Sequence, residues 1–209
     1  MEKLPMTKIK FCGLSCFQDI EIANTLLPDY IGFVLVPQSR RYVTPEMAKK
    51  LKVRLNPKIQ AVGVFLNEKP EIIAELANQN IIHMIQLHGQ ETEQNIKALR
   101  SLTSAPIIQA FTIQTTDDIN RAETSSADLI LLDSGAGTGV VFDWSLIRCR
   151  IKRPFFLAGG LNPANVTAAI QTLSPYGVDV SSGIEINGKK DKHKMAAFTA
   201  AVRKEEEIQ

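Results

Sequence analysis

Short apolar runs alternate with longer amphipathic stretches along almost the whole chain, and turn residues mark the joins. Most of these runs are too apolar for strands with one face in water, so they are typical of parallel strands buried on both faces. The predicted strands lie at about 8–12, 30–35, 60–65, 83–86, 107–111, 128–132, 154–158 and 177–180. This alternation predicts a repeated strand–helix unit.

The stretches between the predicted strands carry helix start signals. Thr44 precedes a proline suited to a first helical turn, and Asn67, Thr92 and Thr115 stand before further amphipathic runs. Asn162 and the following proline precede another run whose apolar residues share one helical face. We therefore expect a helix after most of the strands.

Eight strand–helix units predict parallel pairing with right-handed crossovers, and eight units can close into a (β/α)8, or TIM, barrel. Such barrels usually need about 250 residues. The 209 residues here are few, so some helices must be short, above all after the fifth and sixth strands. We expect one domain over 1–209, since no linker interrupts the pattern. An open doubly wound sheet is the alternative that periodicity leaves open.

Composition narrows the class of protein. The net charge of +2 has no strong block of one sign, which argues against a nucleic-acid partner. No apolar run is long enough to span a membrane, and no signal peptide is recognisable, so a cytoplasmic protein is expected. Three cysteines fit a reducing compartment. No cluster of ligands accompanies Cys12 and Cys16, so no metal is expected, and Cys16 and Cys149 are predicted to be packing residues.

The loops after the last two strands have the chemistry of a phosphate site. Gly159 and Gly160 leave backbone N–H groups unobstructed just before an expected helix opening at 162. Ser181, Ser182 and Gly183 supply small donors on the neighbouring turn. Barrels of this kind commonly bind phosphate at these two loops. Two tight turns without a ligand are the alternative. The glycine-rich segment 135–139 lacks the lysine of a P-loop.

Other strand ends carry candidate catalytic groups. Cys12 ends the first strand beside a glycine turn, and Asp133 ends an apolar run that would desolvate its carboxyl group and raise its pKa. A turn-capping role is the alternative for Asp133. Of Arg40 and Arg41, at most one is expected to point inward, where its guanidinium could bind a carboxylate. His88 is interpreted as a hydrogen-bonded histidine of the barrel rim.

Taken in order, these segments resemble the phosphoribosylanthranilate isomerase family of tryptophan biosynthesis, over Lys10 to about Lys194. The residues that carry the resemblance are Lys10-Phe11-Cys12-Gly13-Leu14, Gly32-Phe33-Val34, Ser39-Arg40-Arg41-Tyr42-Val43, Val62-Gly63-Val64-Phe65, Gln86-Leu87-His88-Gly89, Leu132-Asp133, Gly137-Thr138-Gly139 with Phe142-Asp143-Trp144, Ala158-Gly159-Gly160-Leu161 and Val178-Asp179-Val180-Ser181-Ser182-Gly183-Ile184-Glu185. The chain departs from the family pattern at two positions. Arg40 stands where the family often has Pro or Lys, and Asn187 stands where the family often has Pro.

The resemblance implies a small (β/α)8 barrel that converts an aminoaldose phosphate to an aminoketose phosphate without metal or organic cofactor. By it, Cys12 matches the general base, Asp133 the general acid, and Arg41 the arginine that holds the anthranilate carboxylate. Gly160 and the turn from Ser181 to Gly183 match the phosphate loops. The partner implied is a small phosphorylated substrate, and the sequence leaves monomer and homodimer open.

The resemblance also implies a positioning role for Asp179. The chemistry implies opposite pKa shifts: Asp133 must hold its proton near neutral pH, and Cys12 must be a thiolate. Two rival functions remain at this point. The histidine-pathway isomerase performs the same rearrangement but resembles a two-aspartate design. A non-catalytic barrel that binds phosphosugars would explain the glycine and serine turns alone.

Overall fold

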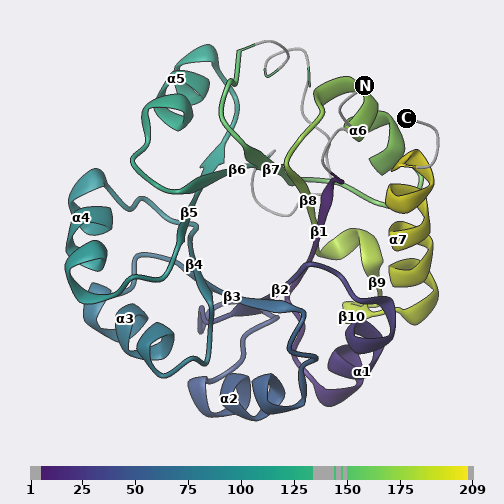
Figure 1. Ribbon diagram of the computed structural model, residues 1–209, viewed down its shortest axis with the longest axis horizontal. Coiled ribbons are helices and arrows are strands. Elements are labelled where there is room, and N and C mark those ends of the chain that lie inside the picture. The colour runs from purple at the N-terminus through teal and green to yellow at the C-terminus, as the bar shows by residue number, and fades with distance from the viewer. Residues whose placement is uncertain (1–5, 134–143, 145–146, 148–149, 207–209) are drawn as a thin grey trace.

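The computed structural model describes residues 6–133, 144, 147 and 150–206. Eight parallel strands follow one another in chain order around a closed barrel, and the first pairs with the last (Figure 1). The strands are β1 (Lys8–Cys12), β2 (Tyr30–Val34), β3 (Gln60–Phe65), β4 (Met84–Leu87), β5 (Ile107–Thr112), β6 (Leu129–Asp133), β7 (Phe155–Leu157) and β8 (Gly177–Val180). The predicted barrel is confirmed, with strand ends within one residue of expectation, and the open sheet is excluded.

The helices form a ring outside the barrel (Figure 1). They are α1 (Phe17–Leu26), α2 (Pro45–Arg54), α3 (Pro70–Asn78), α4 (Glu93–Leu102), α5 (Thr116–Thr124), α6 (Val166–Leu173) and α7 (Lys192–Glu206). Helices α1 to α6 have only 8 to 10 residues each, which allows so short a chain to complete the barrel. A 3-10 turn, η2 (Ser182–Ile184), and a hairpin of β9 (Glu185–Ile186) and β10 (Lys189–Lys190) separate β8 from α7.

Most predicted helix starts are confirmed. Thr44 accepts a hydrogen bond from the backbone of Met47 at the start of α2, and Thr92 and Thr115 cap α4 and α5. At Thr44 and Thr115 the side-chain oxygen accepts an N–H that has no partner inside the helix, and at α4 the Asn95 side chain accepts the N–H of Thr92. Cys16 was predicted to pack inside a helix, and this is wrong: it is exposed and lies at the N-cap of α1.

Two helices begin at other residues than the sequence predicts. Helix α3 begins at Pro70, with Lys69 rather than Asn67 at its N-cap. Helix α6 begins at Val166, not directly after Asn162. The Asn165 side chain explains the second difference, because it accepts the N–H of Asn162 at 2.8 Å and donates to the carbonyl of Gly160 at 3.0 Å. These bonds hold a turn before the helix.

The two-residue period of the strands builds two apolar cores. In β6, Ile130 and Leu132 pack in the large cluster shared with the helices, whereas Leu131 belongs to a second cluster inside the barrel. Three aromatic rings belong to this inner cluster: Phe156 packs edge-on against both Tyr30 and Tyr176, whose hydroxyls lie 2.8 Å apart. Tyr30 opens β2 and Tyr176 precedes β8, so these rings fill the amino-terminal end of the barrel.

No helix in the described part of the chain is both long enough and apolar enough to cross a membrane.

Candidate functional site

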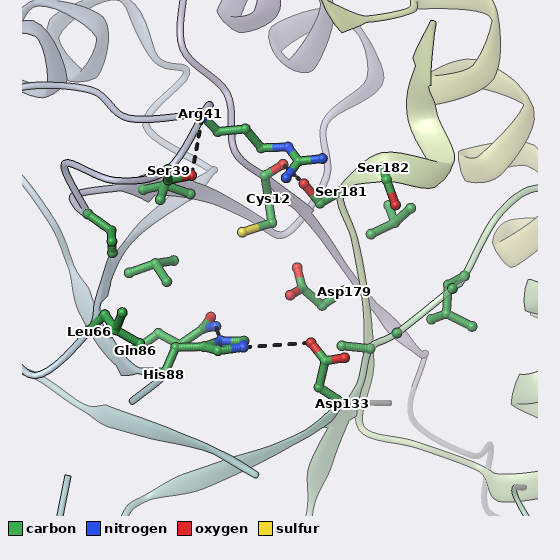
Figure 2. A pocket seen from close by; sticks show the side chains of 18 residues that line it. Cys12, Ser39, Arg41, Leu66, Gln86, His88, Asp133, Asp179, Ser181 and Ser182 are labelled. Carbon is green, nitrogen blue, oxygen red and sulfur yellow. Dashed lines mark hydrogen bonds and ion pairs between the residues drawn. The ribbon is translucent and has the colours of Figure 1, made fainter. Parts of the chain in front are cut away.

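A cavity of about 280 Å³ opens at the carboxyl ends of the strands, where barrels of this class hold their active sites. It collects nearly all of the predicted site residues on one surface (Figure 2). The predicted residues that line it are Cys12, Arg41, Asp133, Gly159, Gly160, Asp179, Ser181 and Ser182. Gly183 does not line the cavity. It contacts the chain at Leu161 instead, so closely that an added Cβ would overlap the carbonyl of that residue.

Cys12 lies at the last position of β1, and its side chain turns into the cavity opposite Asp133 (Figure 2). Gly32 pairs with it on β2 and leaves room for the sulfur, since a Cβ there would lie 2.8 Å from Sγ. The hydroxyl of Ser181 donates to the Cys12 carbonyl at 3.1 Å. The thiol position is therefore fixed from both neighbouring strands.

A buried ion pair lies beneath Cys12. Lys10 is two residues earlier on β1, on the same face, and is completely buried. Its ammonium donates to Asp179 Oδ1 at 2.9 Å, and the carboxylate lines the cavity floor. The carboxylate and Cys12 together hold the pKa of Lys10 above its usual value, although burial alone would lower it. Lys10 is thus a permanent positive charge near the thiol.

The expected low pKa of Cys12 is wrong. Burial raises the pKa of the thiol, and Asp179 adds to this effect. The positive charges of Lys10 and Lys190 lower the pKa but do not outweigh burial. The sequence pattern could not weigh desolvation against two cations whose positions depend on the folded barrel.

A chain of polar side chains leads from the barrel interior to Asp133. Gln86 on β4 is almost fully buried, and its amide nitrogen lies 2.8 Å from Nδ1 of His88. The other ring nitrogen of His88 faces Asp133 Oδ2 at 3.6 Å (Figure 2). His88 was interpreted as a hydrogen-bonded rim residue, and it does form such a bond, but it also lines the cavity beside the predicted acid.

Arg41 enters the cavity from the loop after β2. Its side chain crosses Gly13, where φ is +77° and where a Cβ would collide with the Arg41 chain. The guanidinium is paired with Glu185 and lies at the cavity wall, with 19% of the side chain exposed. The side chain of Arg40 is 62% exposed. One of the two arginines therefore points inward, as expected from the loop, and it is Arg41.

The two glycine and serine turns adjoin each other at one side of the cavity. Gly159 and Gly160 both have positive φ, 82° and 65°, a conformation that glycine adopts without strain. Ser181 and Ser182 follow β8 and line the same wall. Because α6 begins only at Val166, the N–H groups available here belong to the turn itself and not to the first helical turn.

The glycine-rich segment 135–139 and Cys149 lie outside the described residues. Among the residues that are described, no group of three or more His, Cys, Asp or Glu side chains is arranged to hold a metal ion.

Sequence reasoning missed Lys10, Gln86, Glu185 and Lys190. A signal existed for Lys10, since the strand period places it on the same face as Cys12. Glu185 and Lys190 lie in a short hairpin that periodicity does not reveal. The role of Glu185 depends on contacts with a loop about 145 positions earlier in the chain, and that of Lys190 on contacts with Ser181 and Glu185.

The closed barrel and the cavity at the carboxyl ends of its strands define a (β/α)8-barrel enzyme. A family model for N-(5'-phosphoribosyl)anthranilate isomerase matches residues 9–201. The chain belongs to the phosphoribosylanthranilate isomerase family, the isomerases of tryptophan biosynthesis.

Individual relatives agree over nearly the full length. The chain is 39% identical to N-(5'-phosphoribosyl)anthranilate isomerase of Lachnoclostridium phytofermentans, over 93% of this chain and 96% of that protein. A phosphoribosylanthranilate isomerase crystallised with reduced 1-(o-carboxyphenylamino)-1-deoxyribulose 5-phosphate superposes with a TM-score of 0.84, at 36% identity, covering 95% of this chain and all of the other. Monomers generated from the dimeric Thermotoga maritima enzyme superpose equally well, at 37% identity and with the same coverage.

Proposed function

We propose that this isomerase rearranges N-(5-phosphoribosyl)anthranilate by general acid and general base catalysis, with Asp133 as the acid and Cys12 as the base. The observation that carries the proposal is the placement of these two groups on opposite sides of one cavity, which phosphate-type turns and an arginine complete (Figure 2). Acid–base pairs of this kind are recognised by geometry first.

The proposed reaction begins with proton transfer from Asp133 to the ribose ring oxygen. The bond between that oxygen and C1 breaks, and the nitrogen lone pair forms a Schiff base. The Cys12 thiolate then removes the proton from C2, which gives an enolamine that tautomerises to the ketone. Asp133 ends as a carboxylate and Cys12 as a thiol, so one proton must return from the thiol to the carboxylate, directly or through solvent.

Burial raises the pKa of the Cys12 thiol, which disfavours the thiolate that the proposed base step requires. Lys10 and Lys190 are the cations that favour this form. Removing either positive charge would therefore reduce the thiolate fraction further. Burial of the site excludes water from the sugar but also raises the pKa of Cys12. In the proposed mechanism the two buried lysines act against that rise.

The same proposal assigns the substrate ends. Arg41 binds the anthranilate carboxylate, and Gly159, Gly160, Ser181 and Ser182 surround the phosphate with backbone and hydroxyl donors. A relative crystallised with reduced 1-(o-carboxyphenylamino)-1-deoxyribulose 5-phosphate, a compound that carries both a carboxylate and a phosphate, supports a ligand of this chemistry. Phosphate binding supplies remote energy that orients the sugar between acid and base.

We propose a supporting role for two further residues that were placed at the site by expectation. Asp179 holds Lys10 near the thiol through their 2.9 Å ion pair. Gly183 allows the phosphate turns to touch, because its missing side chain admits the Leu161 carbonyl.

The test measures the turnover of purified Cys12→Ala and Asp133→Asn. Turnover is monitored as the loss of anthranilate-type fluorescence after phosphoribosylanthranilate is added. We expect kcat to fall roughly 10²–10⁴-fold in each, the usual contribution of a general acid or base. Cys16→Ala is the matched thiol control, since that cysteine is exposed at the start of α1. Asp128→Asn is the matched carboxylate control at the opposite end of β6. Near-normal turnover in either site variant removes that residue from the mechanism.

A further inference from the structure

Glu185 accepts hydrogen bonds from three cationic side chains, although it does not line the cavity. Its carboxylate accepts Nε of Arg41 at 2.6 Å and Nη2 of the same guanidinium at 2.9 Å. Lys190 Nζ donates to it at 2.8 Å, and Arg40 Nη2 at 3.1 Å. Only 4% of the Glu185 side chain is exposed. Three cations against one carboxylate leave two positive charges beside the cavity.

The hairpin that carries Glu185 is anchored on both sides. Glu185 pairs with Lys190 across β9 and β10. The Lys190 ammonium, 2% exposed, also donates to the carbonyl of Ser181 at 3.0 Å and reaches its hydroxyl at 3.3 Å. Lys194 Nζ donates to the Glu185 carbonyl at 2.9 Å. The carboxylate of Glu185 is therefore held in place relative to the turn after β8. Through its bonds to Arg41 it also holds the loop after β2.

The contact geometry leaves one edge of the Arg41 guanidinium for a ligand. Glu185 occupies the edge formed by Nε and Nη2. Among the described residues, none accepts a hydrogen bond from Nη1, and Arg41 lines the cavity. A free arginine side chain loses conformational entropy when it is ordered. Here that ordering precedes binding, which is the general advantage of a preorganised site.

We propose that Glu185 is a positioning residue that aims Arg41 at the carboxylate of the anthranilate ring and so contributes to substrate specificity. This inference rests on the proposed function, in which Arg41 holds that carboxylate. It assigns to Glu185 no contact with the substrate. A buried ion pair by itself is weak evidence for a stabilising role, so the test must separate aiming from stability.

The first measurement compares two substrates on Glu185→Gln. For phosphoribosylanthranilate we expect KM to rise about ten- to a hundredfold, the typical loss for a charge-assisted hydrogen bond. For N-(5-phosphoribosyl)aniline, which lacks the carboxylate, kcat/KM should change less than about threefold, with product followed by chromatography. An equal loss on both substrates overturns the proposal, because it means that Glu185 only supports the barrel.

The second measurement is a double-variant cycle with Arg41→Ala on phosphoribosylanthranilate. If Glu185 acts through Arg41, adding Glu185→Gln to Arg41→Ala costs less than about threefold in kcat/KM, since neighbours in one network are not additive. Fully additive losses overturn the proposal. Glu185→Asp provides a second, milder variant: it keeps the charge but is one methylene shorter, and its KM should lie between those of wild type and Glu185→Gln.

The control is Asp29→Asn at the opposite end of the barrel. Asp29 also accepts from two cations, Lys8 and Arg203, at 2.9 Å and 3.2 Å. Its loss should lower the melting temperature without changing KM. The acid–base proposal fails separately, through the kcat of the Cys12 and Asp133 variants. Failure of the Glu185 proposal is read from the KM pattern of an active enzyme.

Discussion

Gly183 joins the two turns to which we assign phosphate binding, and Gly183→Ala tests that junction. An added Cβ would overlap the carbonyl oxygen of Leu161 and would lie only 2.9 Å from its carbonyl carbon and 3.0 Å from Cα of Asn162. Carbon atoms pack at about 3.5–4.0 Å. The turn after β8 must therefore move away from the loop after β7 by about 1 Å.

The expected size of the effect follows from that displacement. Moving a binding group by about 1 Å can reduce catalysis about 10²-fold, and we expect that loss in kcat/KM. Overpacking a close contact usually costs about 1–3 kcal/mol of unfolding free energy. In a chain of this size, such a loss lowers the melting temperature by roughly 2–12 °C.

The assay combines steady-state fluorescence kinetics, inhibition by inorganic phosphate and a thermal melt. Inhibition by phosphate should weaken together with kcat/KM. Gly188→Ala is the control: Gly188 has φ of +78° but nothing within 4 Å of an added Cβ. It should lose stability through backbone strain of about 1–2 kcal/mol and keep normal phosphate inhibition. Normal melting and normal phosphate inhibition in Gly183→Ala would refute the reasoning.

Two further predictions concern stability. Lys10→Met leaves Asp179 as an unpaired buried charge, so urea denaturation should show a loss of roughly 3–5 kcal/mol, and adding Asp179→Asn should restore part of it; no loss in Lys10→Met would contradict the pairing. At Asp118, burial alone would raise the pKa, but the N–H of Gln114 and the guanidinium of Arg121 lower it to about 2. Its stabilisation is therefore complete above the unfolded pKa of about 3.8 and disappears as the pH falls towards 2. Melts should show Asp118→Asn less stable at pH 5 and nearly equal to wild type at pH 2, and a constant difference would contradict this.

The sequence predicts the barrel well because its strands are short, apolar and regularly spaced. Cys12, Asp133 and the glycine turns were recognisable because parallel strands bring their carboxyl ends to one side. The start of α6 was placed too early, since the hydrogen bonds of Asn165 are specific to the folded loop. The pKa of Cys12 moved in the unexpected direction because burial depends on packing around the whole barrel.

Glu185 illustrates the part of a site that local patterns do not reveal. Its chemistry comes from a contact with Arg41 across 144 positions of sequence. Nothing in the hairpin itself distinguishes this carboxylate from a solvated surface charge. Only the pairing of β9 with β10, beside the loop after β2, turns it into the centre of a cation cluster.

The aromatic cluster of Tyr30, Phe156 and Tyr176 has a consequence for how substrate enters and product leaves the barrel. The rings close the barrel at the end away from the cavity. Substrate and product must therefore enter and leave through the same opening of the barrel. The two molecules are isomers that carry the same phosphate and the same ring carboxylate, so in the binding mode that we propose they occupy the same residues. The product must therefore leave before the next substrate can bind.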